Sequence, residues 1–285
     1  KLSLNPALHD KIEFDIAINC FIFDFEKRIK VLCPSILKKN EISLLKNKYK
    51  EIFNKNLQNS NNGSIAFNLD KIKQLNENYE KFKKEKNIKK IIRFTINYGI
   101  VPFSILARHA FIAENMLRSL VRLKIIDNND IDNFKSSLKT ITSKFILDCS
   151  LLSKNLISFS QFKKNYGHLR PGTYDINSKN YSLFKKDFFI KKNINIKNKN
   201  HFNLKVSKQK KLDNLLKENK LNLNSSQFFL YLKKGIEARE YSKFIFTKNI
   251  DLILKRISEI AKFKNLSKKQ ISYFTLKDIL NTNFN

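Results

Sequence analysis

Four side chains suited to proton transfer and anion binding fall within residues 166–176. They are His168, Arg170, Tyr174 and Asp175. A histidine near a carboxylate can move a proton at neutral pH, and an arginine can hold a phosphate or carboxylate with two parallel hydrogen bonds. The pattern indicates a site that holds a phosphate-bearing or hydroxyl-bearing ligand. His168 and Asp175 are its candidate catalytic groups, and Arg170 and Tyr174 are candidate binding groups.

The same stretch is predicted to be a loop. It contains Gly167 and Gly172, two of the chain's 5 glycines, and Pro171, one of its 4 prolines. Glycine can adopt positive φ, and proline fixes its own φ near about −65° while moving the preceding residue out of the helical region. Ser158 and Gln161 match a capping box that starts a short helix, and Gly167 is expected to end it.

Arginine is informative here because it is rare, at eight of the 56 basic residues. An ammonium cannot replace a bidentate guanidinium, so each arginine is a better site candidate than any lysine. Three arginines share one face of a strongly amphipathic segment that Pro102 is expected to begin. A fourth lies between two glutamates, Glu237 and Glu240, in a long helical segment. The candidate ligand-binding arginines are Arg108, Arg118, Arg122, Arg170 and Arg239.

A structural interpretation fits the same residues. The arginines, His168 and Asp175 could form a buried polar network that ties three helices together. Glu114 and Arg118 have the i,i+4 spacing of a helical ion pair. His109 lies off the centre of the arginine face and fits an ordinary half-buried histidine.

The N-terminal region carries an acidic cluster of His9, Asp10, Glu13 and Asp15. Glu13 and Asp15 are weak candidates for a hard-metal site, because carboxylate oxygens suit such ions. The alternative is a solvated strand face. Residues 11–22 alternate between apolar and charged side chains, which predicts a short strand, although a helix over the same region fits almost as well.

The formal net charge of +31 suggests nucleic-acid binding. Lysine, asparagine and isoleucine, whose codons are A/T-rich, dominate the sequence, so drift in base composition would produce the same positive charge. Lysine is also spread over every predicted helix. This distribution favours a solvated basic surface and argues against nucleic acid as the partner. The 3 cysteines (Cys20, Cys33 and Cys149) include no C-x-x-C pair, which favours a reducing, cytoplasmic location and argues against a zinc site.

Several common motifs are absent. The sequence has no G-x-G-x-x-G, P-loop, G-x-S-x-G or H-E-x-x-H pattern. A glycine-built nucleotide site is therefore not expected in this segment, and no cofactor is predicted for it. No signal peptide or apolar run of about 20 residues is visible, so no membrane partner is expected. The first residue is not methionine, which suggests a piece of a longer protein.

The predicted fold is mainly α: an irregular helical bundle with a short β element near the N-terminus. It is treated as a single helical region over residues 1–285, with a candidate sub-boundary in the basic, asparagine-rich stretch 177–206. Gly99 is expected to end the helix over residues 88–97, and Ser267 and Thr275 are expected to cap two short helical turns. The predicted helices start at Asn40 and Asn68, cover 88–97 (ended by Gly99), 102–122, 130–152 and 158–166, and start again at Ser207 and Ser226.

Four ordered motifs resemble the middle region of multidomain phosphotransferases similar to phosphoenolpyruvate synthase and pyruvate phosphate dikinase. Rifampin phosphotransferase is a more distant relative with a similar Tyr-Gly-His-x-x-Pro-Gly loop. The resemblance spans nearly the whole chain. The motifs are Asn5-Pro6-x-Leu8-His9-Asp10-Lys11-x-Glu13-Phe14, Tyr98-Gly99-x-x-Pro102-Phe103-x-x-Leu106-Ala107-Arg108-x-Ala110-Phe111-Ile112-Ala113, the loop Tyr166–Ile176 as it stands, and Arg239-Glu240-Tyr241-x-Lys243-Phe244-x-Phe246-Thr247-Lys248-Asn249.

The resemblance implies a kinase-type transferase that divides its work among domains. An ATP-grasp domain uses ATP and Mg²⁺ to phosphorylate a histidine on a mobile domain, and that histidine passes the phosphoryl group to an acceptor. Both domains lie outside this chain, and by resemblance they are its partners together with a small-molecule acceptor. His168 lacks the setting of the phosphocarrier histidine, so the resemblance implies a pocket residue. The chain departs from the family in the basic stretch 177–192, where acidic residues are usual.

The sequence therefore supports one leading hypothesis and two alternatives. The leading one is an acceptor-binding or interdomain helical region of such a phosphotransferase. A basic helical nucleic-acid-binding module is the first alternative. The second is a structural connector, in which His168, Arg170 and Asp175 should be buried and hydrogen-bonded to one another, with no cleft beside them.

Overall fold

The computed structural model describes residues 18–34, 36–58, 63–190 and 202–281. These residues form helices joined by irregular segments, so the fold is mainly α, as predicted. No residue of the described ranges lies in a strand, and the predicted β element is wrong for residues 18–22. Residues 20–25 are all buried, which an alternating strand with one solvated face cannot achieve. Residues 11–17 lie outside the described ranges, as do His9, Asp10 and the metal candidates Glu13 and Asp15.

The chain divides into two compact units, each built from three segments. Unit 1 takes residues 1–66, 107–138 and 199–236, and unit 2 takes residues 67–106, 139–198 and 237–285. Helices α4 (Ser64–Glu77), α7 (Val101–Arg122) and α13 (Ser225–Phe263) contribute to both units. The predicted sub-boundary at 177–206 stays a prediction.

Unit 1 is held together by aromatic packing between helices. Phe21 contacts Phe53 at 5.9 Å between ring centroids, and Phe53 contacts Tyr231 edge-on at 5.7 Å. Its helices, besides parts of α4, α7 and α13, are α2 (Phe25–Leu32), α3 (Lys39–Gln58), α8 (Asn128–Ser137) and α12 (Val206–Glu218).

A buried carboxylate links two segments of unit 1. Arg122 Nε donates to Asp24 Oδ2 at 2.5 Å, and Ser119 Oγ donates to Asp24 Oδ1 at 2.6 Å. Burial raises the pKa of Asp24, but the hydrogen bonds from Arg122 and Ser119 outweigh it and hold that pKa below its usual value. The pair fixes the segment before α2 against α7.

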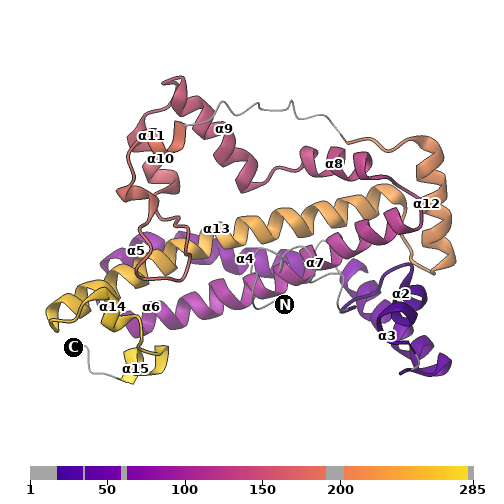
Figure 1. The fold of residues 1–285 in the computed structure, drawn as a ribbon, viewed down its shortest axis with the longest axis horizontal. Helices are drawn as coiled ribbons and strands as arrows, with labels where there is room; N and C mark the ends of the chain where they lie inside the picture. The colour runs from indigo at the N-terminus through magenta and orange to yellow at the C-terminus, as the bar shows by residue number, and fades with distance from the viewer. Residues whose placement is uncertain (1–17, 35, 59–62, 191–201, 282–285) are drawn as a thin grey trace. The chain divides into compact units, whose positions relative to one another are not determined.

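Unit 2 contains the loop of the third sequence motif, residues 166–176 (the motif loop), which packs against α13 (Figure 1). Helices α9, α10 and α11 enclose an apolar cluster in which Leu152, Phe162 and Tyr166 are almost fully buried. The elements of unit 2, besides parts of α4, α7 and α13, are α5 (Tyr79–Lys84), α6 (Ile88–Thr95), η2 (Ile96–Ile100), α9 (Ile141–Ser153), α10 (Phe159–Tyr166), η3 (Tyr181–Leu183), α11 (Asp187–Ile190), α14 (Lys268–Ile271) and α15 (Leu276–Asn281).

The predicted helix end at Gly99 is wrong. The chain stays helical from α6 through the π-helical turn η2 into α7, and the N–H of Val101 donates to the carbonyl of Ile96. Pro102 has no N–H and would crowd the preceding turn of an α-helix, and the wider π turn gives its ring room. Gly99 is needed for packing, because a Cβ there would lie 2.9 Å from both Leu75 Cδ2 and Phe246 Cβ.

One other prediction on the middle of the chain is wrong. The predicted helix 130–152 is broken, because Leu138 is extended and Thr140 caps a new helix by accepting from the N–H of Ser143. The stretch 177–203 has no clear period, which predicts a loop or a poorly ordered segment. Its described part, residues 177–190, is irregular apart from η3 (Tyr181–Leu183) and α11 (Asp187–Ile190), and Tyr181, Phe184 and Phe189 pack onto the apolar cluster of α9 and α10.

The strongest periodic patterns match the structure. The helix expected from Ser226 is α13, which continues for 39 residues. Ser267 and Gln270 form a reciprocal capping box, and Thr275 accepts from the N–H of Asp278. The helix at Ser207 starts one residue earlier, and the helix at Asn68 starts at Ser64.

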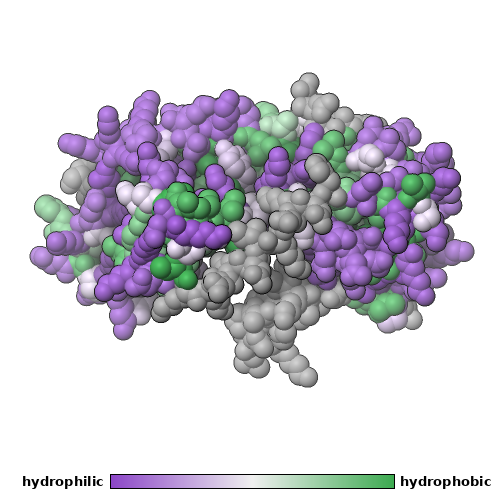
Figure 2. Space-filling view, turned by 90° about the horizontal axis from the view of Figure 1, so that it is seen from above, coloured by the Kyte–Doolittle hydropathy of each residue, from purple (hydrophilic) through white to green (hydrophobic). Residues whose placement is uncertain are grey.

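The continuous helix Ile88–Arg122 is long and apolar enough, by length and composition alone, to cross a membrane, although 44% of its apolar window is buried in the protein. In Figure 2 hydrophilic side chains cover most of the visible face of the described residues, and hydrophobic areas are small.

We predict that Gly99→Ala destabilises the protein by about 1–3 kcal/mol. Alanine usually stabilises a helix by about 1 kcal/mol relative to glycine, but here the methyl group meets Leu75 and the backbone-proximal Cβ of Phe246. Urea unfolding measures the change. Asn97→Ala, at an exposed position in the same turn, is the control and should be neutral or stabilising. A stabilised Gly99→Ala variant would contradict the packing role.

A lysine-lined cavity beside the His168 loop

The loop after α10 is a closed structure. The N–H of Tyr181 donates to the carbonyl oxygen of Leu169 at 2.7 Å, and the N–H of Ser182 donates to the carbonyl oxygen of Gly167 at 3.0 Å. Both glycines were expected to allow positive φ, but no glycine of the described residues has it, and Gly167 has φ −59°. Close approach explains Gly167, because a Cβ there would lie 2.4 Å from the carbonyl oxygen of Lys163.

A carboxylate on α13 anchors this loop. Asp251 is 2% exposed and accepts from the guanidinium of Arg170, while the amide of Asn180 donates to it at 2.8 Å. Lys255 pairs with its second oxygen at 2.8 Å. Arg170 also donates to the carbonyl oxygens of Asp175 and Ser178, at 3.3 and 3.2 Å. Both ends of the loop are therefore tied to one helix position.

The anchored loop presents His168 as a neutral base. Its Nε2 lies 3.2 Å from the carbonyl oxygen of Phe244, and because a carbonyl can only accept, Nε2 carries the proton. Burial, with a smaller contribution from the nearby Lys248 charge, lowers the pKa of His168 to about 4. At neutral pH the ring is uncharged, and Nδ1 holds the free lone pair.

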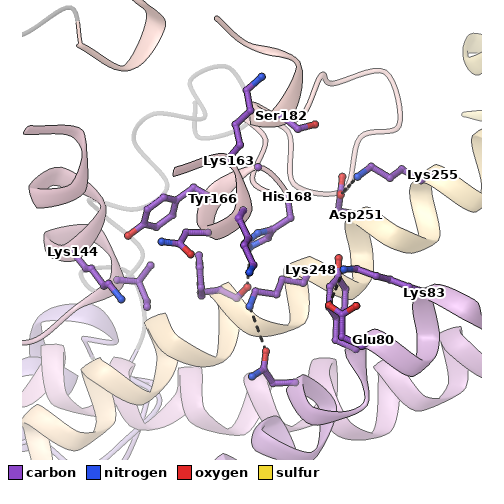
Figure 3. A pocket seen from close by; sticks show the side chains of 17 residues that line it. Glu80, Lys83, Lys144, Lys163, Tyr166, His168, Ser182, Lys248, Asp251 and Lys255 are labelled. Atoms are coloured by element: carbon purple, nitrogen blue, oxygen red, sulfur yellow. Dashed lines mark hydrogen bonds and ion pairs between the residues drawn. The ribbon is translucent and has the colours of Figure 1, made fainter. Parts of the chain in front are cut away.

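A cavity of about 600 Å³ lies beside His168 (Figure 3). This volume is within the usual range for a small-molecule site. Unit 2 provides all of its walls: α4 and α5, the start of α9, α10 with the first loop residues, η3 and α13. The polar and aromatic lining includes Asn76, Tyr79, Glu80, Tyr166, His168, Ser182, Phe244 and Asp251.

The charged lining of the cavity is strongly positive. Two carboxylates, those of Glu80 and Asp251, face six lysines: Lys83, Lys144, Lys163, Lys164, Lys248 and Lys255. The preference for arginine over lysine in the sequence analysis therefore overlooked the cations that line this cavity.

Lys248 stands out among these lysines. Its ammonium is 5.3 Å from the centre of the Phe244 ring, and its hydrogen bond to Asn76 Oδ1 is long, at 3.4 Å. Burial and the neighbouring Lys83 lower its pKa, against a smaller opposing effect of Glu80. Figure 3 shows it beside His168.

The other predicted site residues are not at this cavity. Asp175 is exposed, and its carboxylate accepts from the N–H of Asn177 at 2.8 Å, so it shapes the loop. Tyr174 is 62% exposed. Arg170 does not line the cavity, although it pairs with Asp251, which does. The predicted constellation of His168, Arg170 and Asp175 around one ligand is thus not what the loop geometry provides.

The three arginines of α7 belong to unit 1. Arg122 pairs with Asp24, and Arg118 pairs with Glu114 at 3.0 Å as its i,i+4 spacing suggested. Arg108 is exposed, and Arg239, on the unit 2 part of α13, is half-buried. For Arg118 and Arg122 the structural interpretation of the sequence fits the contacts.

His109 is buried in unit 1. Its Nδ1 is 3.0 Å from the hydroxyl of Tyr231 and its Nε2 is 3.1 Å from that of Ser64. Burial lowers its pKa to about 4. It is more buried than the half-buried histidine that the sequence suggested.

Lys248 and Asp251 were missed by reasoning from the sequence, although a signal was present. Phe244, Lys248, Asp251 and Lys255 follow i,i+3 and i,i+4 spacing, which places them on one face of a helix. Phe244 and Lys248 lie within the fourth motif, and Asp251, the carboxylate that anchors the loop, follows two residues after its end.

No protein-family model, curated protein sequence or solved structure matches this chain. Among the described residues no group of three or more His, Cys, Asp and Glu side chains could hold a metal ion.

We predict that stability falls as pH decreases from about 6.5 to about 4. His109 and His168 have folded pKa values of about 4, below the ordinary value of 6.5, so the unfolded chain binds more protons in this window. The contribution of each neutral histidine to the free energy of unfolding is fully present above the pKa of the unfolded chain. It is lost as the pH falls through the pKa of the folded protein, by roughly 3 kcal/mol for each histidine. Urea unfolding across this range measures it. His109→Gln and His168→Gln should each flatten the profile, and an unchanged profile in both would contradict their burial as neutral rings.

We also predict that Asp251→Asn destabilises the protein by about 3 kcal/mol, because the buried guanidinium of Arg170 loses its counter-charge. Glu259→Gln on the same helix is the control. It breaks an exposed pair with Arg256 and should cost less than about 1 kcal/mol. Equal effects of the two substitutions would show that the anchor is not energetically special.

Proposed function

We propose that unit 2 provides the acceptor pocket of a phosphotransferase similar to phosphoenolpyruvate synthase. The observation that carries the proposal is that Tyr166–His168, the start of the motif loop, forms one wall of a lysine-lined cavity of about 600 Å³. The fourth motif meets the same cavity through Phe244 and Lys248. Two segments that support the family resemblance thus border one site.

The chemistry follows from the protonation states. A hydroxyl group that attacks a phosphoryl group must lose its proton, and the unprotonated Nδ1 of His168 is the candidate acceptor. Lysine ammonium groups around the cavity favour negative charge as it develops on the transferring phosphoryl group. An anion in the cavity also raises the pKa of His168, which makes the ring a better base once the ligand is bound.

ATP and Mg²⁺ belong to a different part of the proposed enzyme. By resemblance an ATP-grasp domain holds both, and a mobile domain carries the phosphohistidine. The kinase activity of the whole protein therefore depends on partner domains, whereas this chain binds and deprotonates the acceptor.

The two alternative functions, a structural connector and a nucleic-acid-binding module, predict different observations. A purely structural connector predicts a closed network of His168, Arg170 and Asp175 without a cleft, whereas a cavity borders His168 and Asp175 is exposed. A nucleic-acid interface predicts binding that weakens steeply with salt and depends on one clustered basic face.

The test is a two-step phosphorylation assay on the intact parent protein with radiolabelled ATP and with pyruvate, whose enol form carries the attacking hydroxyl group, as the acceptor probe. In His168→Asn we expect labelling of the mobile histidine at the parental rate and transfer to the acceptor reduced by about 10²-fold, as for loss of a general base. His109→Asn is the matched control, because it alters a histidine of similar burial and pKa in unit 1, and its transfer rate should be unchanged.

Parental transfer by His168→Asn would overturn the assignment of His168. The coding sequence gives an earlier check, since an ATP-grasp domain should precede this segment and a Ser-His domain should follow it. Absence of both would overturn the phosphotransferase proposal.

A further inference from the structure

The charges around the cavity are not balanced by the protein. Glu80 is already paired with Lys83 at 2.7 Å, and Asp251 with Lys255 at 2.8 Å as well as with Arg170. The other four lysines of the lining have no carboxylate partner among the described residues. Any ligand that enters therefore meets an uncompensated positive surface.

Lys248 is the most informative of these four lysines. Lys144 and Lys164 are exposed, and the ammonium of Lys163 lies over the ring of Phe159 at 4.5 Å. Lys248 is half-buried on the cavity wall, beside both His168 and a second lysine, Lys83. A partly desolvated ammonium in such a place is stabilised strongly by an added anion, because the local dielectric is lower than in water.

We propose that the cavity binds an acceptor that itself carries an oxyanion, a carboxylate or a phosphate, and that Lys248 pairs with this group. This inference rests on the proposed function, which it narrows to small anionic hydroxyl compounds. Pairing at Lys248 leaves the rest of the ligand beside His168, so the anion sets which hydroxyl group meets Nδ1. A neutral polyol lacks that anchor.

The position of Lys248 on α13 fixes the point from which its side chain reaches the ligand. It lies one helical turn after Phe244, whose carbonyl holds His168, and three residues before Asp251, which holds the loop. Lys248 and the carbonyl group that holds His168 thus lie on the same helix.

The experiment compares three ligands of similar size: glycerol, glycerate and glycerol 3-phosphate. Their binding to the protein is measured by isothermal titration calorimetry or ligand-observed NMR at fixed ionic strength. We expect at least one of the two anions to bind about tenfold or more tightly than glycerol, as a charge-assisted contact requires. Lys248→Met keeps the aliphatic stem on Phe244 and should remove that difference.

The control is Lys243→Met, which removes the same charge from an exposed position on α13 outside the cavity. It should retain anion binding. Equal losses in both variants would attribute the binding to diffuse positive charge and overturn the proposal, as would no preference for either anion over glycerol. The preference between glycerate and glycerol 3-phosphate decides whether the anchor takes a carboxylate or a phosphate.

This outcome is separable from that of the phosphotransferase assay. Anion binding that requires Lys248 supports the anchor even if His168→Asn transfers at the parental rate, in which case only the proposed reaction fails. Binding that does not require Lys248 overturns the anchor even if His168 proves essential for transfer.

Discussion

The buried carboxylate of Asp251 is the interaction on which the proposed site depends. It accepts from Arg170 at one end of the loop and from Asn180 at the other, so one side chain closes the loop onto α13. Burying a charge is unfavourable unless it is paired and hydrogen-bonded, and here the pairing also determines a conformation. His168, between the loop closure and the helix, takes its position from that arrangement.

The loop anchor also shapes the electrostatics of the cavity. Because Asp251 is engaged by Arg170 and Lys255, its negative charge does not offset the remaining lysines. Glu80 is likewise held by Lys83. The interactions that make the loop rigid therefore leave the cavity positive, and a single arrangement provides both a fixed histidine and an attraction for anions.

Local signals allowed much of the fold to be predicted. Periodic apolar spacing located α3 and α13, and the Ser267 capping box was found because its residues are three positions apart. The failures involve distant partners. Gly99 looked like a helix end, but its role is set by Leu75 and Phe246. The aromatic residues of 177–190 show no clear period in the sequence, because their burial is set by partners on α9 and α10.

The site was predictable in part, and the reason lies in how charge is used. Rare residues located the His168 loop correctly, because an unusual backbone path needs unusual residues. The same reasoning favoured Arg122 and Arg170, whose guanidinium groups are instead paired with buried carboxylates. A fork of five donors suits a fixed internal pair, whereas a lysine keeps a mobile point charge that a ligand can recruit. Helical spacing places Lys248 on one face with Phe244 and Asp251, but in a chain with so many lysines the three-dimensional arrangement is needed to show that this lysine lines the cavity.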